Sequence, residues 1–114
     1  MGDCIFCRIA RKELASEIVL ETDELLAFRD INPQAPTHIV LIPKRHIAKL
    51  LDLEADDEAL VGKLVRTASE LARKEGIAER GFRLVANCNR EAGQSVDHLH
   101  FHLLGGRPMR WPPG

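Results

Sequence analysis

Apolar residues along this chain recur with two different spacings, and these spacings predict a definite order of strands and helices. Short apolar runs predict strands at Val19–Leu20, Leu25–Phe28, His38–Ile42, Phe82–Cys88 and His98–Leu104. Apolar positions from Leu60 to Ala72 recur at helical spacing, and Gly76 is placed to end that helix. A short helical segment beginning at Cys4–Ile9 and ending near Ala15 is expected to precede the first strand.

The predicted order is a short helix, three strands, a long helix, two strands and an irregular tail from Arg107 to Gly114. Pro33 and Pro36 predict a loop between the second and third strands, because proline disrupts both helix and ladder pairing. Consecutive strands without intervening helices favour antiparallel pairing. We therefore expect an α+β fold with an antiparallel sheet of about five strands. One domain should span residues 1–114.

Composition and charge narrow the classes of partner. The 114 residues include 16 Lys and Arg against 17 Asp and Glu, a net charge of −1, so duplex nucleic acid is a poor match. No apolar stretch approaches the length of a membrane span, and the N-terminus does not follow a signal-peptide pattern. Three cysteines, an odd number, argue against a disulfide framework. We expect a cytoplasmic protein with neither nucleic-acid nor membrane partners.

The five histidines are the main candidates for catalytic or metal-binding residues. His38 and His46 bracket the third predicted strand, and the other three alternate with apolar residues in the last strand, at His98, His100 and His102. A strand turns successive side chains to opposite faces, so these three would share one face. From this strand alone, a metal site and a catalytic site both stay open. A purely structural role is disfavoured because buried neutral imidazoles need hydrogen-bond partners.

The segment His98–Leu104 fits the pattern H-φ-H-φ-H-φ-φ, where φ is apolar, and resembles the signature of the histidine triad family. Several further motifs, in the same order along the chain, resemble the Hint branch of that family. They are Asp30–His38, Ile42–His46, Gly93–Ser95, Leu104–Arg107 and Trp111–Gly114. The resemblance therefore covers essentially the whole chain.

This resemblance implies a homodimeric nucleotide hydrolase or transferase that acts on adenosine monophosphate (AMP) joined through phosphorus to an amine or a similar leaving group. The middle histidine, His100, corresponds to the family's nucleophile. A neutral imidazole nitrogen can attack phosphorus and form a covalent nucleotidyl-histidine, which water then opens. His38 and His102 would orient or support His100, and the Ser95 hydroxyl would assist the leaving group. No organic cofactor is expected.

The resemblance also implies nucleotide contacts from several parts of the chain. Asp30 would accept hydrogen bonds from the ribose hydroxyls, with Ile31 against the base and Asn87 near the phosphate. In the family the proline-rich tail reaches the partner subunit, so Trp111 would lie near the partner's site.

The loop around Gly93 is the expected phosphate-binding element. Gly93 would let the backbone approach the phosphate closely, because glycine lacks a side chain. The N–H groups around Gln94 and Ser95 would form an anion-binding concavity.

Cys4 and Cys7 form a C-x-x-C pair that suits zinc, because both thiolates can reach one tetrahedral ion. A closed zinc site needs four ligands, and His46 and His98 have no duty in the proposed chemistry. Some histidine triad proteins carry such a site, which would be structural and would pin the N-terminal segment to the sheet. The competing interpretations are two structural thiols or a redox pair, although no thioredoxin-like βαβ pattern follows the motif.

Two other functions remain open from the sequence. A nucleotide-binding interaction module with incidental turnover would keep Asp30 and the Gly93 loop but show a negligible rate. A metal-dependent hydrolase would use the triad histidines as ligands, and its rate would not survive metal removal. For the nucleotide hydrolase that the resemblance implies, the leaving group could be an amine, an acyl group or a protein lysine.

Overall fold

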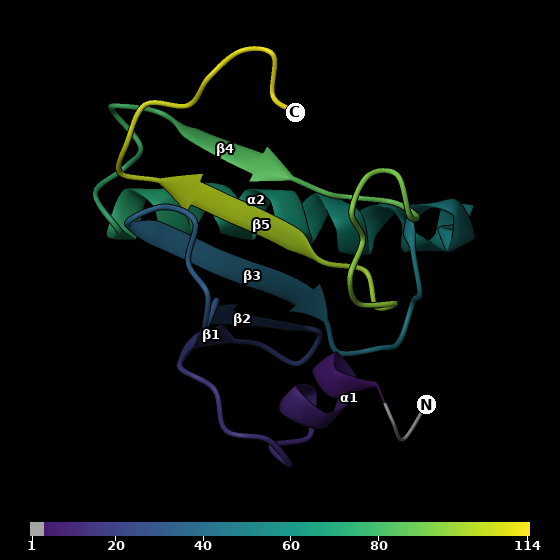
Figure 1. The fold of residues 1–114 in the computed structure, drawn as a ribbon. Helices are drawn as coiled ribbons and strands as arrows, with labels where there is room; N and C mark the ends of the chain where they lie inside the picture. Colours follow the sequence, from purple (N-terminus) through teal and green to yellow (C-terminus); the bar gives the residue numbers. More distant parts are fainter. Residues whose placement is uncertain (1–3) are drawn as a thin grey trace.

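A computed structural model describes residues 4–114 of the chain, so the first three residues of the expected domain lie outside it (Figure 1). The elements follow in the predicted order, with two short 3₁₀ turns, η1 and η2, that the sequence pattern did not predict. They are α1 (Ile5–Ala10), β1 (Ile18–Glu21), β2 (Leu25–Arg29), β3 (Thr37–Pro43), η1 (Leu50–Asp52), η2 (Ala55–Asp57), α2 (Glu58–Lys74), β4 (Phe82–Val85) and β5 (Phe101–Gly105). No helix in this part of the chain is long and apolar enough to cross a membrane.

Within residues 4–114 the strands form one five-stranded antiparallel sheet in the order β1-β2-β3-β5-β4. β3 is the central strand, and all seven of its residues are buried. The α+β fold with an antiparallel sheet and one long helix is therefore confirmed.

The two faces of the sheet are covered by different helices. Ile39 and Leu41 of β3 pack with Leu64 and Leu71 of α2, which runs along one face (Figure 1). The alternate residues Val40 and Ile42 point to the opposite face and pack with Ile9 of α1. β3 is thus buried on both sides because each of its two side-chain sets meets a helix.

α2 buries the apolar stripe that its spacing predicted, at Leu60, Leu64, Ala68, Leu71 and Ala72. Val65, although part of the predicted apolar pattern, is 41% exposed. Gly76, two residues after the last residue of the helix, has the left-handed conformation (φ +75°). The N–H groups of Gly76 and Ile77 donate to the carbonyls of Arg73 and Ala72, at 3.1 and 3.0 Å, which is a Schellman motif.

Both late strands are shorter than predicted, because the ladder of β5 begins at Phe101 and β4 ends at Val85. His98 and His100 therefore precede the last strand rather than lying within it. Here the Leu99 N–H donates to the Ile47 carbonyl (2.6 Å) instead of to a neighbouring strand. The predicted alternation still holds, since Leu99 joins the same apolar cluster as the Phe101 side chain of β5.

Candidate active site and metal cluster

A cavity of about 450 Å³ lies between α1 and the face of the sheet opposite α2. Its lining combines apolar side chains from α1 and the sheet with a few polar groups at one side. The lining residues are Ile5, Phe6, Ile9, Leu14, Ala15, Ser16, Phe28, Arg29, Asp30, Ile31, Val40, Ser95, Val96, His100 and His102. An apolar cavity with a few convergent polar groups is typical of a small-molecule site.

His100 is buried beside this cavity, and one hydrogen bond determines the tautomer of its ring. Its Nδ1 lies 2.7 Å from the backbone carbonyl of His98. A carbonyl can only accept, so Nδ1 carries the proton and Nε2 of the neutral ring has an available lone pair. The Phe6 ring packs edge-on against the imidazole, with centroids 5.1 Å apart. His100 thus presents a nucleophilic nitrogen in an oriented ring.

His38 and His102 form a hydrogen-bond relay next to His100. The backbone N–H of Gln34 donates to Nδ1 of His38 (3.0 Å), so the proton of the neutral His38 ring is on Nε2. That Nε2 lies 2.9 Å from Nδ1 of His102 and donates to it. Nε2 of the neutral His102 ring then carries a proton, and this N–H is a donor suited to a phosphate oxygen.

Burial keeps the relay neutral near pH 7. Desolvation, with smaller contributions from His100 and His38, lowers the pKa of His102 to about 4. Burial likewise holds the pKa of His38 below its usual value, and the nearby Asp30 carboxylate opposes this shift. An Asp30 oxygen lies 3.4 Å from Nε2 of His38.

One possible set of metal ligands is close together in the structure and consists of Asp30, His38 and His102. The hydrogen bonding argues against it. Nε2 of His38 faces both other residues and carries the proton that the Gln34 N–H forces onto it. A protonated nitrogen cannot ligate a metal, so this group functions as a hydrogen-bond relay.

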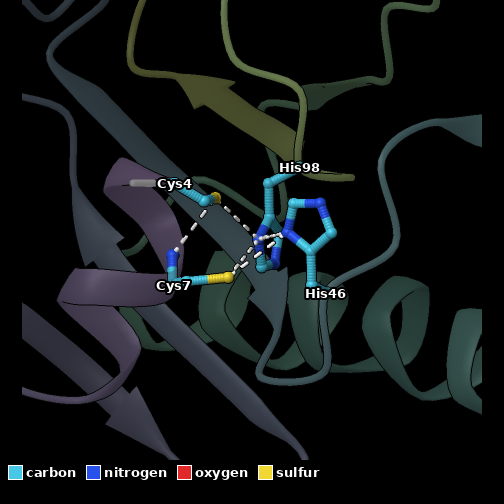
Figure 2. A group of neighbouring side chains, drawn as sticks. All are labelled: Cys4, Cys7, His46 and His98. Carbon is cyan, nitrogen blue, oxygen red and sulfur yellow. Dashed lines mark hydrogen bonds between the residues drawn. The ribbon is translucent and has the colours of Figure 1, made fainter. Parts of the chain in front are cut away.

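A second group of side chains converges at a place that the cavity lining does not include, and Figure 2 shows its members, Cys4, Cys7, His46 and His98. Nδ1 of His98 lies 3.3 Å from Sγ of Cys4, 3.6 Å from Sγ of Cys7 and 3.2 Å from Nδ1 of His46. Sγ of Cys7 lies 3.2 Å from Nδ1 of His46. For a tetrahedral ion, these separations should be roughly 3.3 Å between nitrogens and 3.6 Å between nitrogen and sulfur.

The second nitrogen of His98 explains why its Nδ1 suits a metal. Nε2 lies 2.8 Å from the Pro43 carbonyl and must donate to it, which leaves Nδ1 without a proton. Burial holds the pKa of His98 below its usual value, which favours this neutral form. The lone pair on Nδ1 therefore faces two sulfurs and a nitrogen at once, while the Pro43 carbonyl holds the other side of the ring in place. This arrangement is expected of a metal-binding cluster.

A family model described as the HIT domain matches residues 11–109. The chain belongs to the HIT family. It is 50% identical over 107 residues to the purine nucleoside phosphoramidase of Escherichia coli, an alignment that covers 94% of this chain and 90% of that protein.

Solved structures agree with this membership of the HIT family. A HIT family hydrolase from Legionella pneumophila superposes with a TM-score of 0.97 at 52% identity, covering 98% of this chain and 100% of the other. A HIT family hydrolase from Clostridium thermocellum gives a TM-score of 0.94 at 43% identity, with 96% of each chain covered.

The residues expected to bind nucleotide in this HIT domain fall into two groups. Those that line the cavity are Asp30, Ile31, Ser95, His100 and His102. The cavity lining within residues 4–114 does not include Asn87, Gly93, Gln94 or Trp111. Trp111 is 83% exposed, in the tail that Arg83 holds through the Arg110 carbonyl at 2.9 Å.

Gln94 holds the loop around Gly93 together. Its Nε2 donates to the carbonyls of Ala48 (2.8 Å) and Val96 (3.1 Å), and its Oε1 accepts the Asn89 N–H (2.9 Å). Its backbone N–H donates to the Asn89 carbonyl at 3.1 Å. Gly93 has a φ of +84° and open space where a Cβ would be, so a ligand can approach the backbone closely there.

The apolar wall contributed by α1 was not predicted from the sequence. Ile5, Phe6 and Ile9 line the cavity, and Phe28 faces them from β2 at 5.5 Å between ring centroids to Phe6. A signal was present, because the predicted metal site brings the Cys4–Cys7 segment next to His98. The residues between and after the cysteines must then lie near the triad.

Proposed function

We propose that this HIT-family protein is a hydrolase of purine nucleoside 5′-phosphoramidates or related AMP conjugates, working through a covalent nucleotidyl-His100. The name of the E. coli relative supports the substrate class, and the names of the solved neighbours support a hydrolase. The observation that carries the proposal is the bond from Nδ1 of His100 to the His98 carbonyl, which leaves Nε2 unprotonated.

The reaction follows from this tautomer in two steps. Nε2 of His100 attacks phosphorus, a new P–N bond forms, and the bond to the leaving amine breaks as that nitrogen takes a proton from solvent water. Ser95, which lines the cavity, supplies a hydroxyl that can hydrogen-bond to the leaving nitrogen. Water then attacks phosphorus and gives up a proton to solvent, which breaks the P–N bond to His100, restores its neutral ring and releases AMP. The Nε2–H of His102 stabilises the phosphate oxygens during both steps.

The cavity lining supports the orientation of the nucleotide. The apolar wall of Phe6, Ile9 and Phe28 suits a purine ring, and Ile31, which is 97% exposed, stands at the rim where a base could cover it. Asp30 lines the cavity beside His38, so its carboxylate can accept hydrogen bonds from ribose hydroxyls. The loop carrying Gly93, Gln94 and Ser95 is the proposed phosphate-side element.

Zinc is the proposed ion of the Cys4, Cys7, His46 and His98 cluster. The mixed sulfur and nitrogen ligands and their separations support zinc, and the four protein ligands leave no open position for catalysis. Bound zinc would contribute folding energy by joining the N-terminal segment to the sheet. Thiol ligands must stay reduced, and the three cysteines within residues 4–114 are all free thiols, which supports a cytoplasmic location.

A homodimer joined at the β4 edge is the proposed assembly. β4 is an edge strand with one exposed and three half-buried residues, and such edges readily pair with another strand. The tail carrying the exposed Trp111 is attached to β4 through Arg83 and runs past that edge (Figure 1). In such a dimer Trp111 would approach the partner's cavity.

Replacement of the nucleophile tests the enzymatic proposal. We expect His100→Ala to abolish hydrolysis of adenosine phosphoramidate, with the fold intact by circular dichroism, and Cys88→Ser to be unaffected. Mass spectrometry of a quenched wild-type reaction should find AMP bound to His100. Wild-type turnover by His100→Ala would refute the mechanism.

Two further measurements separate the rival functions. Tight AMP binding by the wild type with a negligible rate on phosphoramidates would favour an interaction module. Chelation should lower kcat at most in part, because the nucleophile is a protein nitrogen. Complete loss of kcat in a chelated protein that keeps its fold would favour a metal-dependent hydrolase.

A further inference from the structure

α1 borders both the metal cluster and the nucleotide cavity. Cys4 caps the helix, and its sulfur accepts the Cys7 N–H at 3.4 Å, so both sulfurs point toward the two histidine ligands (Figure 2). The intervening side chains, Ile5 and Phe6, turn to the cavity, followed by Ile9 one turn later. The same short helix therefore carries half of the metal ligands and one wall of the cavity.

Few interactions besides these side chains hold α1 in place. It has six residues, too few for a helix that is stable by itself. The backbone hydrogen bonds of this segment are local, from Arg8 to Cys4 and from Arg11 to Cys7, each at 3.0 Å. Its position consequently depends on the packing of Phe6, Ile9 and Ala10 against the sheet and on the ligands of the metal cluster.

Phe6 contacts a histidine from each site. Its ring lies edge-on to His98, with centroids 6.0 Å apart, and to His100, with centroids 5.1 Å apart. The two histidines are also joined directly, because Nδ1 of His100 donates to the His98 carbonyl at 2.7 Å. A displacement of α1 would remove the aromatic contact from both rings and loosen the orientation of His100.

We propose that metal binding at the cluster and nucleotide binding in the cavity are thermodynamically linked through α1, with Phe6 as a positioning residue for His100. The choice of a nucleotide as the second ligand rests on the proposed function. Both ligands favour the docked position of α1, since the metal binds its cysteines and the nucleotide contacts its apolar side chains. Linkage is reciprocal, so each ligand raises the affinity for the other by the same factor, which we expect to be about tenfold.

Two affinities measured on the same protein test the linkage. AMP binding is measured by calorimetry on zinc-loaded protein and on chelator-treated protein, and zinc affinity is measured by competition with a chromogenic chelator, with and without saturating AMP. We expect zinc to tighten AMP binding about tenfold and AMP to tighten zinc binding by the same factor. Phe6→Ala keeps all four metal ligands, and its coupling factor should fall toward one. Cys88→Ser, the matched cysteine control, should retain the full coupling.

The outcomes separate this linkage from the proposed function. Failure of the zinc-loaded protein to bind AMP would contradict the proposed function. Equal AMP affinity with and without zinc would overturn the linkage and leave that function standing. An unchanged coupling factor in Phe6→Ala would overturn the role of Phe6. If chelated protein loses its circular dichroism signal, its AMP affinity is not compared. Instead, the rate of zinc release from loaded protein to excess chelator is measured with and without AMP, and a rate unaffected by AMP overturns the linkage.

Discussion

Acidification should destabilise this protein through His102, and the structure sets the size of the effect. The pKa of His102 is lowered to about 4 in the folded protein, against 6.5 for an unperturbed histidine. Between these values the unfolded chain binds a proton that the folded chain does not. Stability from this group is therefore complete above pH 6.5 and is lost as the pH falls toward 4.

The magnitude follows from the two pKa values of His102. Each pKa unit corresponds to about 1.36 kcal/mol, so the whole interval corresponds to about 3 kcal/mol. At pH 5 the loss due to this half-buried side chain should be about 2 kcal/mol relative to pH 8. Burial sets the direction of the pKa shift. A charged His102 next to His38 and His100 would lose solvation, and the Asp30 carboxylate offsets only a small part of that loss.

The assay is urea unfolding of wild type and His102→Gln at pH 8 and pH 5. Glutamine keeps an oxygen that can accept the Nε2–H of His38, but it does not titrate. Protonation of the metal cluster occurs in both proteins and cancels when the two pH dependences are subtracted, so the difference reports His102 together with its coupling to His38 and His100. The wild type should lose about 2 kcal/mol more than the variant between pH 8 and pH 5. Equal losses in the two proteins would refute the reasoning.

Two matched pairs of substitutions give further predictions. A Cβ on Gly105 would meet the Ile77 side chain, 3.0 Å from its Cβ, so Gly105→Ala should cost about 1–3 kcal/mol in urea unfolding. A Cβ on Gly62 of α2 would meet open space, so Gly62→Ala should instead stabilise by about 1 kcal/mol, and the same sign at both sites would contradict this packing. Zinc at about 100 times its Kd should stabilise wild type and Cys88→Ser by about 2.7 kcal/mol. Cys7→Ser should gain much less in the same thermal unfolding experiment, and an equal gain would rule out the cluster as the zinc site.

The fold was largely predictable because its pattern is local. The helical spacing from Leu60 to Ala72 and the stop at Gly76 are properties of neighbouring residues, and the structure has both. The strand ends were less predictable. Whether His98–His100 joins a ladder depends on which partner its backbone finds, and the Leu99 N–H bonds to Ile47 instead.

The candidate site was predictable as a set of residues and less so as a geometry. The C-x-x-C spacing led to Cys4 and Cys7, and the structure brings both together with His46 and His98, as expected. The lining of the cavity by α1 was missed, because periodicity does not say which face of a six-residue helix meets the triad.

The sequence by itself determined the order of the elements, the alternation of histidines with apolar residues and the family to which those motifs belong. Only the tertiary structure decided what each histidine nitrogen can do. The pairing of β3 with β5 brings His38 and His102 within 2.9 Å, although 64 positions separate them. The loop before β5 in turn places the His98 carbonyl against Nδ1 of His100. A tautomer depends on which donor or acceptor each nitrogen meets, and the strand register and the path of the backbone, not the spacing along the chain, select that neighbour.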